Sequence, residues 1–275
     1  MRAAFAVRAW AAIAPGLQSQ EQWLQWADAP VCPVGDTAVE LPRVPAMARR
    51  RLGHLAKMAV SVADSVLPPE EGADIPVVWA SRYGDADKAL GLLRSQAQDE
   101  PLSPTAFGLS VHNAVGAQHS ILRGMRANAV CVASSHCAPE AGIVEAVGLL
   151  SDAQAPAEVL LVCYDEPLRT DYAAFHDEPA AQYAWAVRLA PLQAGEAGFA
   201  LHAVDGEGPA AEQGAPSGLP HSEVGVPSGL PHSEGGAPSG LPHGLDALHF
   251  LLQGERQSLV HGHATGQWMW ERVHA

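Results

Sequence analysis

The chain has 275 residues, and its 16 basic and 30 acidic side chains give a formal charge of −14 at neutral pH. This acidic balance excludes a protein that binds duplex nucleic acid through a basic face. No apolar run approaches the roughly 18 residues of a membrane span, because charged or polar side chains interrupt each one. The length suits one soluble domain, or one and a half.

The N-terminus and the cysteines indicate a cytoplasmic protein. Arg8 interrupts the alanine-rich first residues, and what remains is too short for the apolar region of a secretory signal. The four cysteines are scattered, with no Cys-X-X-Cys pair, and lie at Cys32, Cys131, Cys137 and Cys163. Such spacing is typical of reduced cytosolic thiols.

Strand-like runs alternate with amphipathic helical patterns along the first 205 residues. In chain order, the patterns predict a strand at 5–13, helices at 18–27 and 45–67, a strand at 75–80, helices at 86–98 and 109–122, a strand at 129–133, a helix at 139–151 and a strand at 158–164. An antiparallel pair is expected at 185–189 and 199–204, and a helix at 245–252 and a strand at 268–270 end the chain. This alternation predicts an α/β fold with helices flanking a mixed sheet.

A low-complexity repeat interrupts this pattern. Three copies of Pro-Ser-Gly-Leu-Pro-His lie at 216–221, 227–232 and 238–243, each beginning 11 residues after the previous one. The unit holds too little apolar surface to offset its ordering entropy, which predicts a disordered insertion rather than a metal site built from its histidines. The expected organisation is a folded unit over 1–205, the insertion over 206–244, and a completing helix and strand over 245–275.

Two stretches carry candidate chemistry. The first begins after the strand at 75–80 with Ala-Ser-Arg-Tyr-Gly and continues, over 103–113, as Ser-Pro-Thr-Ala-Phe-Gly-Leu-Ser-Val-His-Asn. The second, over 128–142, is a strand, a sharp turn and a helix. A turn residue at a helix N-terminus meets unsatisfied amide groups and the positive end of the helix dipole, which stabilise an anion such as a thiolate.

Together these stretches resemble the N-terminal half of β-ketoacyl synthases of the thiolase superfamily. They are more similar to the truncated β-ketoacyl synthase-like proteins of aryl polyene and xanthomonadin-type pigment clusters. The resemblance covers 1–205 and resumes in the last 30 residues, and the repeat has no counterpart in it. It implies the N-terminal half of a thiolase-like fold, with no cofactor and no metal.

The resemblance also locates the position of the synthase nucleophile, a cysteine at the turn. An ungapped count from Asn113 places His136 there and leaves Cys137 one residue further on. One residue rotates a side chain by about 100° at a helix start, so Cys137 is expected to point elsewhere unless a one-residue shift restores it. The two partner histidines of a synthase would come from a second half, for which the chain has no room after Val204. We therefore expect no catalytic residue in this chain.

The resemblance implies a partner. In full-length synthases the strand before the nucleophile pairs across a two-fold axis, and the preceding helix lines the partner's acyl pocket. The corresponding dimer strand here is Asn128, Ala129, Val130, Cys131, Val132 and Ala133. The predicted pocket residues share a face of the helix at 109–122 and are Val111, Ala114, Val115, Gln118 and Leu122. Core packing is the alternative for that face. An unpaired strand edge calls for an obligate partner.

Three further groups have simpler interpretations. Arg43 and the run at 49–51 form a basic cluster that fits either an acidic carrier protein or a solvated helix start. His261 and His263 make no recognisable zinc pattern. Asp165 and Glu166 end a strand, where carboxylates are common without acid–base catalysis.

The sequence thus predicts a noncatalytic subunit similar to a chain length factor. It would form a heterodimer with a full-length β-ketoacyl synthase in aryl polyene or fatty-acid-type biosynthesis and meet the acyl carrier protein indirectly. Two alternatives remain open: an acyltransferase or condensing enzyme that uses Cys137, and a module that docks an acyl carrier protein.

Overall fold

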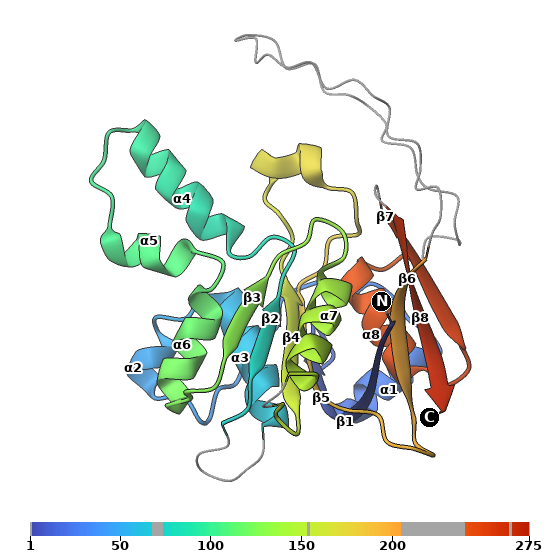
Figure 1. Cartoon of the computed structure of the whole chain (residues 1–275). Helices are drawn as coiled ribbons and strands as arrows, with labels where there is room; N and C mark the ends of the chain where they lie inside the picture. Colours follow the sequence, from blue (N-terminus) through green and yellow to red (C-terminus); the bar gives the residue numbers. More distant parts are fainter. Residues whose placement is uncertain (1, 68–73, 153–154, 205–239, 264–265, 275) are drawn as a thin grey trace.

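An eight-stranded mixed sheet organises the molecule (Figure 1). The structure, a computed structural model, describes residues 2–67, 74–152, 155–204, 240–263 and 266–274. The strand order across the sheet is β3-β2-β4-β5-β1-β6-β8-β7. The strands are β1 (Arg2–Ile13), β2 (Val77–Ala80), β3 (Ala129–Val132), β4 (Val159–Asp165), β5 (Tyr183–Ala190), β6 (Ala197–Val204), β7 (Ser258–His263) and β8 (Gly266–His274).

Helices cover both faces of the sheet. They are α1 (Gln20–Asp28), α2 (Ala46–Arg49), α3 (His54–Val66), α4 (Ala86–Ala97), α5 (Pro104–Ser110), α6 (Ala114–Arg123), α7 (Ala138–Leu150) and α8 (His243–Leu252), with a 3₁₀ segment, η1, at Thr170–Phe175. One hydrophobic cluster joins α1, α7 and α8 to one face, and a second joins α3 and α6 to the other. The mixed α/β fold predicted from the alternating pattern is confirmed.

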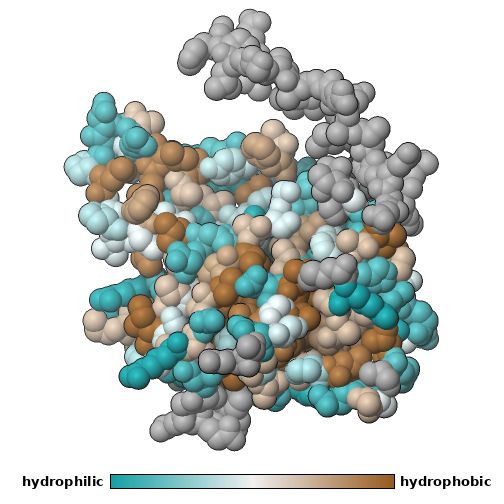
Figure 2. Space-filling view, viewed as in Figure 1, coloured by the Kyte–Doolittle hydropathy of each residue, from teal (hydrophilic) through white to brown (hydrophobic). Residues whose placement is uncertain are grey.

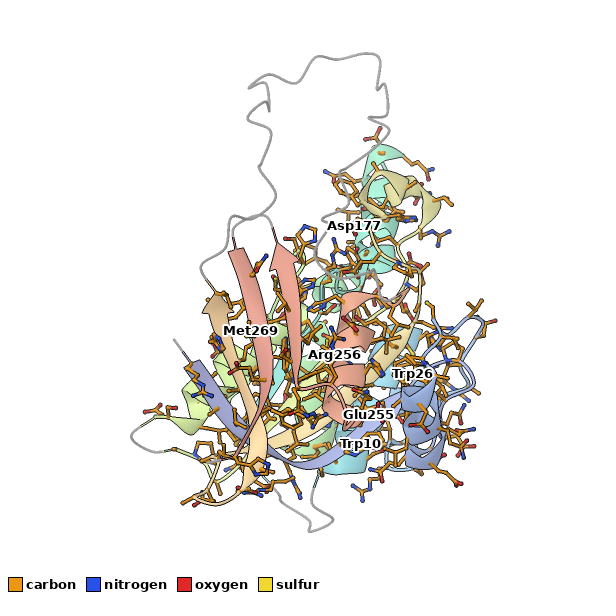
Figure 3. The ribbon with its side chains drawn as sticks, turned by 90° about the vertical axis from the view of Figure 1, so that its right-hand side faces the viewer. Trp10, Trp26, Asp177, Glu255, Arg256 and Met269 are labelled. Carbon is orange, nitrogen blue, oxygen red and sulfur yellow. The ribbon has the colours of Figure 1, made fainter. Side chains whose placement is uncertain are left out.

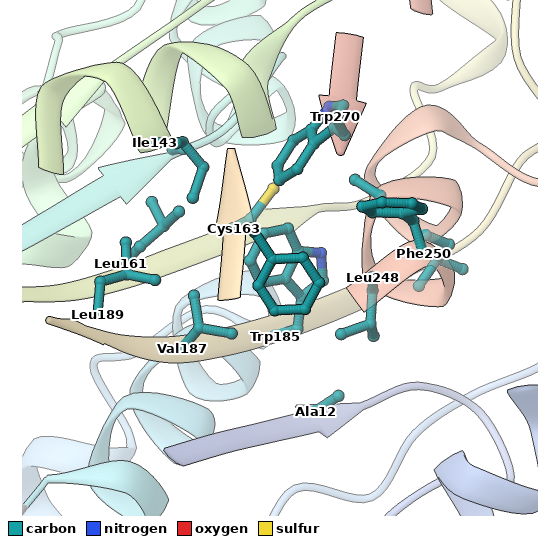
Figure 4. Packing of buried hydrophobic residues seen from close by; sticks show 14 of the residues in the cluster. Ala12, Ile143, Leu161, Cys163, Trp185, Val187, Leu189, Leu248, Phe250 and Trp270 are labelled. Atoms are coloured by element: carbon teal, nitrogen blue, oxygen red, sulfur yellow. The ribbon is translucent and has the colours of Figure 1, made fainter. Parts of the chain in front are cut away.

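The cluster beneath α7 and α8 contains large aromatic side chains (Figure 4). Trp185 of β5 and Trp270 of β8 are fully buried, together with Phe250 of α8 and Cys163 of β4. Complete burial of a large apolar side chain stabilises a fold by about 1.5–3 kcal/mol. This cluster therefore joins the C-terminal helix and strand to the rest of the domain.

The middle of the sheet differs from the prediction. The strands β5 and β6 do not pair with each other, because β1 lies between them and is antiparallel to both. With 12 residues, β1 is long enough to pair with β6 through residues 2–5 and with β5 through residues 6–13, with a bulge between Val7 and Ala9. The connection at 191–196 therefore crosses β1 instead of closing the predicted hairpin.

Two predicted helices are divided. The helix expected at 45–67 breaks before Gly53, which is the N-cap of α3. The helix expected at 109–122 breaks at Val111, whose extended backbone (φ −72°, ψ 150°) ends α5. Asn113 then becomes the N-cap of α6. After each break the next helix begins at a residue suited to an N-cap, Gly53 or Asn113, and the apolar spacing on which the prediction relies runs on across the break.

The C-terminal unit begins earlier than predicted. Leu241 and His243 are buried, and α8 starts at His243, so the end of the third repeat copy belongs to the folded domain. The copies at 216–221 and 227–232, and the disorder predicted for them, lie outside the described residues. Within the described ranges, no helix is long and apolar enough to cross a membrane.

Candidate functional site

The turn between β3 and α7 is the elbow that the sequence singles out. Cys137 is the N-cap of α7, and its amide donates a hydrogen bond of 3.1 Å to the Ser134 hydroxyl. The His136 side chain is 44% exposed, whereas Cys137 is only 7% exposed. The two neighbouring side chains thus point in different directions, His136 outward and Cys137 into the protein.

The Cys137 thiol lies in surroundings that oppose ionisation. Burial raises its pKa to about 12, and the negative charge of Glu140 contributes in the same direction. Nucleophilic cysteines depend on the opposite shift, because the thiolate is the reactive species. The surroundings of Cys137 thus favour the protonated thiol.

A buried cluster of ionisable side chains lies behind the elbow. Glu140 is fully buried, and its Oε1 accepts hydrogen bonds from His243 Nε2 (2.7 Å) and Trp270 Nε1 (2.8 Å). The His243 ring stacks on His261 with 3.2 Å between ring centroids, and His261 Nε2 donates to the His136 carbonyl at 2.8 Å. The cluster connects α7, α8 and β7 to the backbone of the elbow.

Glu140 and His243 shift each other's pKa in opposite directions. Burial alone would raise the pKa of Glu140, but the charge of His243 and its hydrogen bond lower it below the usual value. Burial alone would lower the pKa of His243, and the Glu140 carboxylate raises it instead. Sequence reasoning missed His243 because it falls inside the repeat. The sequence feature that indicates such a pair is Glu140, a carboxylate in the first turn of an apolar helix, because a buried carboxylate needs a partner.

Charged side chains cover the elbow from outside. Arg82 donates from Nη2 to Asp177 Oδ2 (2.6 Å), and its Nη1 lies 3.3 Å from Glu178 Oε1. His136 Nδ1 is 3.4 Å from Arg82 Nη2 and 3.6 Å from Asp177 Oδ2. Asp177 lies toward the end of the molecule that carries η1 and α4, away from Trp10 (Figure 3). An ionic network of this chain thus borders the exposed side chain of His136.

A small cavity lies beside this network. Its volume is about 40 Å³, and its lining includes Arg82, Tyr83, Asp165 and Tyr183.

The strand-end carboxylates at Asp165 and Glu166 hold neighbouring segments. Asp165 accepts hydrogen bonds from the Ser81 hydroxyl (2.8 Å) and from the amides of Arg82 (3.0 Å) and Tyr83 (3.1 Å). Burial raises the pKa of Asp165 to about 6. Glu166 Oε1 lies 2.6 Å from His54 Nδ1. Asp165 thereby fixes the turn after β2, and Glu166 fixes the start of α3.

His112, from the sequence stretch after α5, fastens that stretch to the elbow strand. Its Nε2 donates to the Val132 carbonyl at 2.9 Å. Gly84 lies against the same ring, because a Cβ at this glycine would be 2.9 Å from His112 Nδ1. Its φ of +59° also favours glycine. The two stretches that carry the resemblance are therefore in direct contact.

The five predicted pocket residues do not share one face. Val111 lies outside α6 and is exposed, whereas Ala114 and Val115 are buried. Val115 packs in the α3 cluster, and Leu122 packs against it. Gln118 is half-buried. Core packing, the alternative interpretation, therefore describes Val115 and Leu122.

A buried carboxylate fixes the rotation of α6. Asp64 of α3 accepts hydrogen bonds from His119 Nε2 (3.2 Å) and Arg123 Nε (2.7 Å). Ile121, on the opposite side of α6, is 80% exposed. The helix thus turns one side to the core of this chain and leaves an apolar side chain outside.

The predicted dimer strand is an edge of the sheet. Four of its six residues form β3, which is the end strand of the described sheet and pairs only with β2 there. The carbonyls of Asn128 and Val132 accept from amides of Val77 and Ser81. Because this orientation alternates along a strand, Val130 also faces β2, and the backbone groups of Ala129 and Cys131 face the open edge.

The remaining candidates form no site in the described part of the chain. Arg43 donates to the Asp64 carbonyl at 3.1 Å, and the arginines at 49–51 are exposed at the end of α2. No group of three potential metal ligands occurs among the described residues.

The fold is thiolase-like. Residues 23–271 match the family model of the β-ketoacyl synthase N-terminal domain. The chain belongs to this family. A search of the curated proteins finds no match.

Solved structures share the fold. A chain from the complex of a ketosynthase (ApeO) with its chain length factor (ApeC), from Xenorhabdus doucetiae, is 24% identical with a TM-score of 0.73, and the match covers 98% of this chain and 99% of that chain. The ishigamide ketosynthase/chain length factor is 14% identical (TM-score 0.57; 73% and 67% covered). A β-ketoacyl synthase from Burkholderia phymatum is 11% identical (TM-score 0.53; 68% and 59% covered).

Proposed function

We propose that this chain is a noncatalytic subunit similar to a chain length factor, which pairs with a full-length β-ketoacyl synthase. The observation that carries the proposal is the state of the elbow. Its only cysteine is turned inward with a pKa raised to about 12, and the exposed side chain at the turn is His136, beside the Arg82–Asp177 ion pair. Chemistry at this elbow would require an accessible thiolate.

The open edge of β3 supports the heterodimer. Unpaired backbone groups of an edge strand readily pair with another chain. Ala129 and Cys131 direct such groups away from β2, along the strand that the family resemblance assigns to the two-fold axis. The similar structure from Xenorhabdus doucetiae, a complex of a ketosynthase with its chain length factor, also supports this choice of partner.

The partner synthase would carry the chemistry and receive the acyl carrier protein. This chain would influence the length of the acyl product through residues beside the shared interface. Of the predicted pocket residues, Val111 and Gln118 keep surface outside the core and are the better candidates. The product class that we propose is an aryl polyene or a fatty-acid-type chain, in keeping with the family resemblance.

The strand pairing is tested by replacing Ala129 with proline. Proline removes the amide donor that faces the open edge and is tolerated at such positions. Ala129 is exposed, and its amide does not serve the β2 ladder, so the isolated chain should keep its thermal midpoint. The control Ala129→Thr keeps the amide and has high β propensity.

The two variants are compared by coexpression with the full-length synthase, purification on a tag carried by the synthase, and titration of the purified partners. We expect Ala129→Pro to lose most of the complex and Ala129→Thr to retain it. Equal binding by both variants, with both folded, would mean that β3 does not pair with the synthase.

A further inference from the structure

The segment between β2 and α6 forms a projecting arm, defined here as residues 85–113. It contains α4 and α5, which extend away from the body of the molecule (Figure 1). Neither helix has a buried residue, although every other helix of eight or more residues in the described chain has several. Helices of this length are marginal in water without packing.

Apolar side chains are concentrated on this exposed segment. The described residues include eleven exposed large hydrophobic side chains, of which five lie on the arm or on the adjoining helix α6: Leu93, Leu102, Phe107, Val111 and Ile121. Phe107 is 63% exposed. Figure 2 shows hydrophobic surface over this region. An exposed concentration of this kind marks an interaction site.

The charge of the arm favours a partner with an apolar protein surface over an anionic partner. Its charged residues are four acidic side chains and two basic ones, Lys88 and Arg94. An anionic membrane or an acidic carrier protein would need an excess of basic side chains. An apolar, nearly neutral surface fits the apolar surface of another protein subunit.

The position of the arm identifies that subunit. The arm lies on the same side of the molecule as β3 and α6 (Figure 1). His112 connects its base to β3 by the hydrogen bond to the Val132 carbonyl. A body that pairs with the open edge of β3 must therefore occupy the space beside the arm.

We propose that the arm clamps the partner synthase, with Phe107 as the apolar anchor at the contact. This inference rests on the proposed function, because the synthase is the body that pairs with β3. Aromatic side chains that become desolvated at the centre of an interface contribute much of the binding free energy. The arm would thus add a second contact region, separate from the strand pairing.

The test replaces Phe107 with aspartate and measures affinity for the full-length synthase by titration. Phe107 is mostly exposed in the isolated chain, so Phe107→Asp should fold with an unchanged thermal midpoint. The dissociation constant should rise by at least about 30-fold, the loss typical of an interface hot spot. Phe107→Leu should retain most of the affinity. Leu24→Asp, at another exposed apolar position, on α1, should have no effect.

Hydrogen exchange gives an independent readout. Amides of α4 and α5 should become protected when the synthase binds the wild-type chain, and this protection should be lost in Phe107→Asp. The arm proposal would be wrong if Phe107→Asp binds tightly and the arm of the wild-type chain gains no protection in the complex. If Ala129→Pro still weakens the complex in that case, the proposed function stands without the arm. Absence of any complex with the wild-type chain would overturn the proposed function.

The arm could instead bind a second copy of this chain. Gel filtration of the isolated chain over a range of concentrations tests for such self-association. If Phe107→Asp abolishes self-association and leaves synthase binding intact, the arm packs against a second copy and the proposal is wrong. A monomeric wild-type chain, together with the loss of synthase affinity in Phe107→Asp, supports it.

Discussion

Replacing Asp64 with alanine should destabilise the domain through the loss of one buried charge. Asp64 is nearly buried in α3, and it pairs with the fully buried His119 and with Arg123, both on α6. Burial alone would raise the pKa of Asp64, but the hydrogen bonds from His119 and Arg123 lower it below its usual value. The carboxylate is therefore ionised and stabilising at neutral pH.

The magnitude follows from the exposure of the three side chains. Removing one partner of a buried ion pair costs about 3–5 kcal/mol, because the other charge stays buried without compensation. The Arg123 side chain is 21% exposed and recovers part of its hydration, which reduces the expected loss to about 2–3 kcal/mol. For a domain of this size, that loss lowers the thermal midpoint by about 4–12 °C.

Urea denaturation of Asp64→Ala, Arg123→Ala and the double variant measures this contribution. A coupling energy of about 0.5–3 kcal/mol is expected for residues in direct contact. Asp28→Ala, an exposed carboxylate at the end of α1, serves as the control and should change stability by less than about 0.5 kcal/mol. A similarly small loss for Asp64→Ala, or additive single effects, would refute the assigned role of Asp64.

Two further predictions concern buried residues, the first behind the elbow and the second between α6 and β2. The pKa of His243 is raised above 6.5 in the folded state, so its pairing with Glu140 contributes stability that is fully present below pH 6.5 and is lost as the pH rises through the folded pKa. The pKa of Glu140 is lowered in the folded state, so Glu140 contributes its stability at pH values above its usual pKa of 4.5. The thermal midpoint of the wild-type chain, followed by scanning fluorimetry, should therefore fall more between pH 6 and pH 9 than that of His243→Gln, and parallel curves would contradict the pairing. A methyl group at Gly116 would lie 2.8 Å from the ring of Trp79, so Gly116→Ala should cost about 1–3 kcal/mol in urea denaturation, and an unchanged midpoint would show that the ring moves freely.

Most of the fold can be predicted from the sequence, because the spacing of apolar residues along the chain shows which side of each strand or helix is buried. The alternating pattern located the central strands and most helices to within a few residues, as at α7, predicted at 139–151 and found at Ala138–Leu150. Apolar spacing does not show where a helix ends, however. The break at Val111 depends on backbone conformation and on the cap at Asn113, and it separates residues that the spacing placed on one face.

Long-range pairing explains the other differences. Nothing local indicates that β1 inserts between β5 and β6, because both of them have the same apolar pattern in either arrangement. His243 was missed for a related reason. Its six-residue motif is identical to two other copies, and only the fold brings this copy against Glu140.

The proposed role of this chain is to assist a synthase without contributing a nucleophile. Its most direct test is a reconstituted synthesis with the full-length synthase and a loaded carrier protein, comparing the wild-type chain with Cys137→Ala. Products should require the chain, and Cys137→Ala should support the same rate and product length, because the proposed role needs no thiolate from the buried Cys137. Loss of product with Cys137→Ala, in a complex that still forms, would contradict the account and assign the catalytic cysteine to this chain.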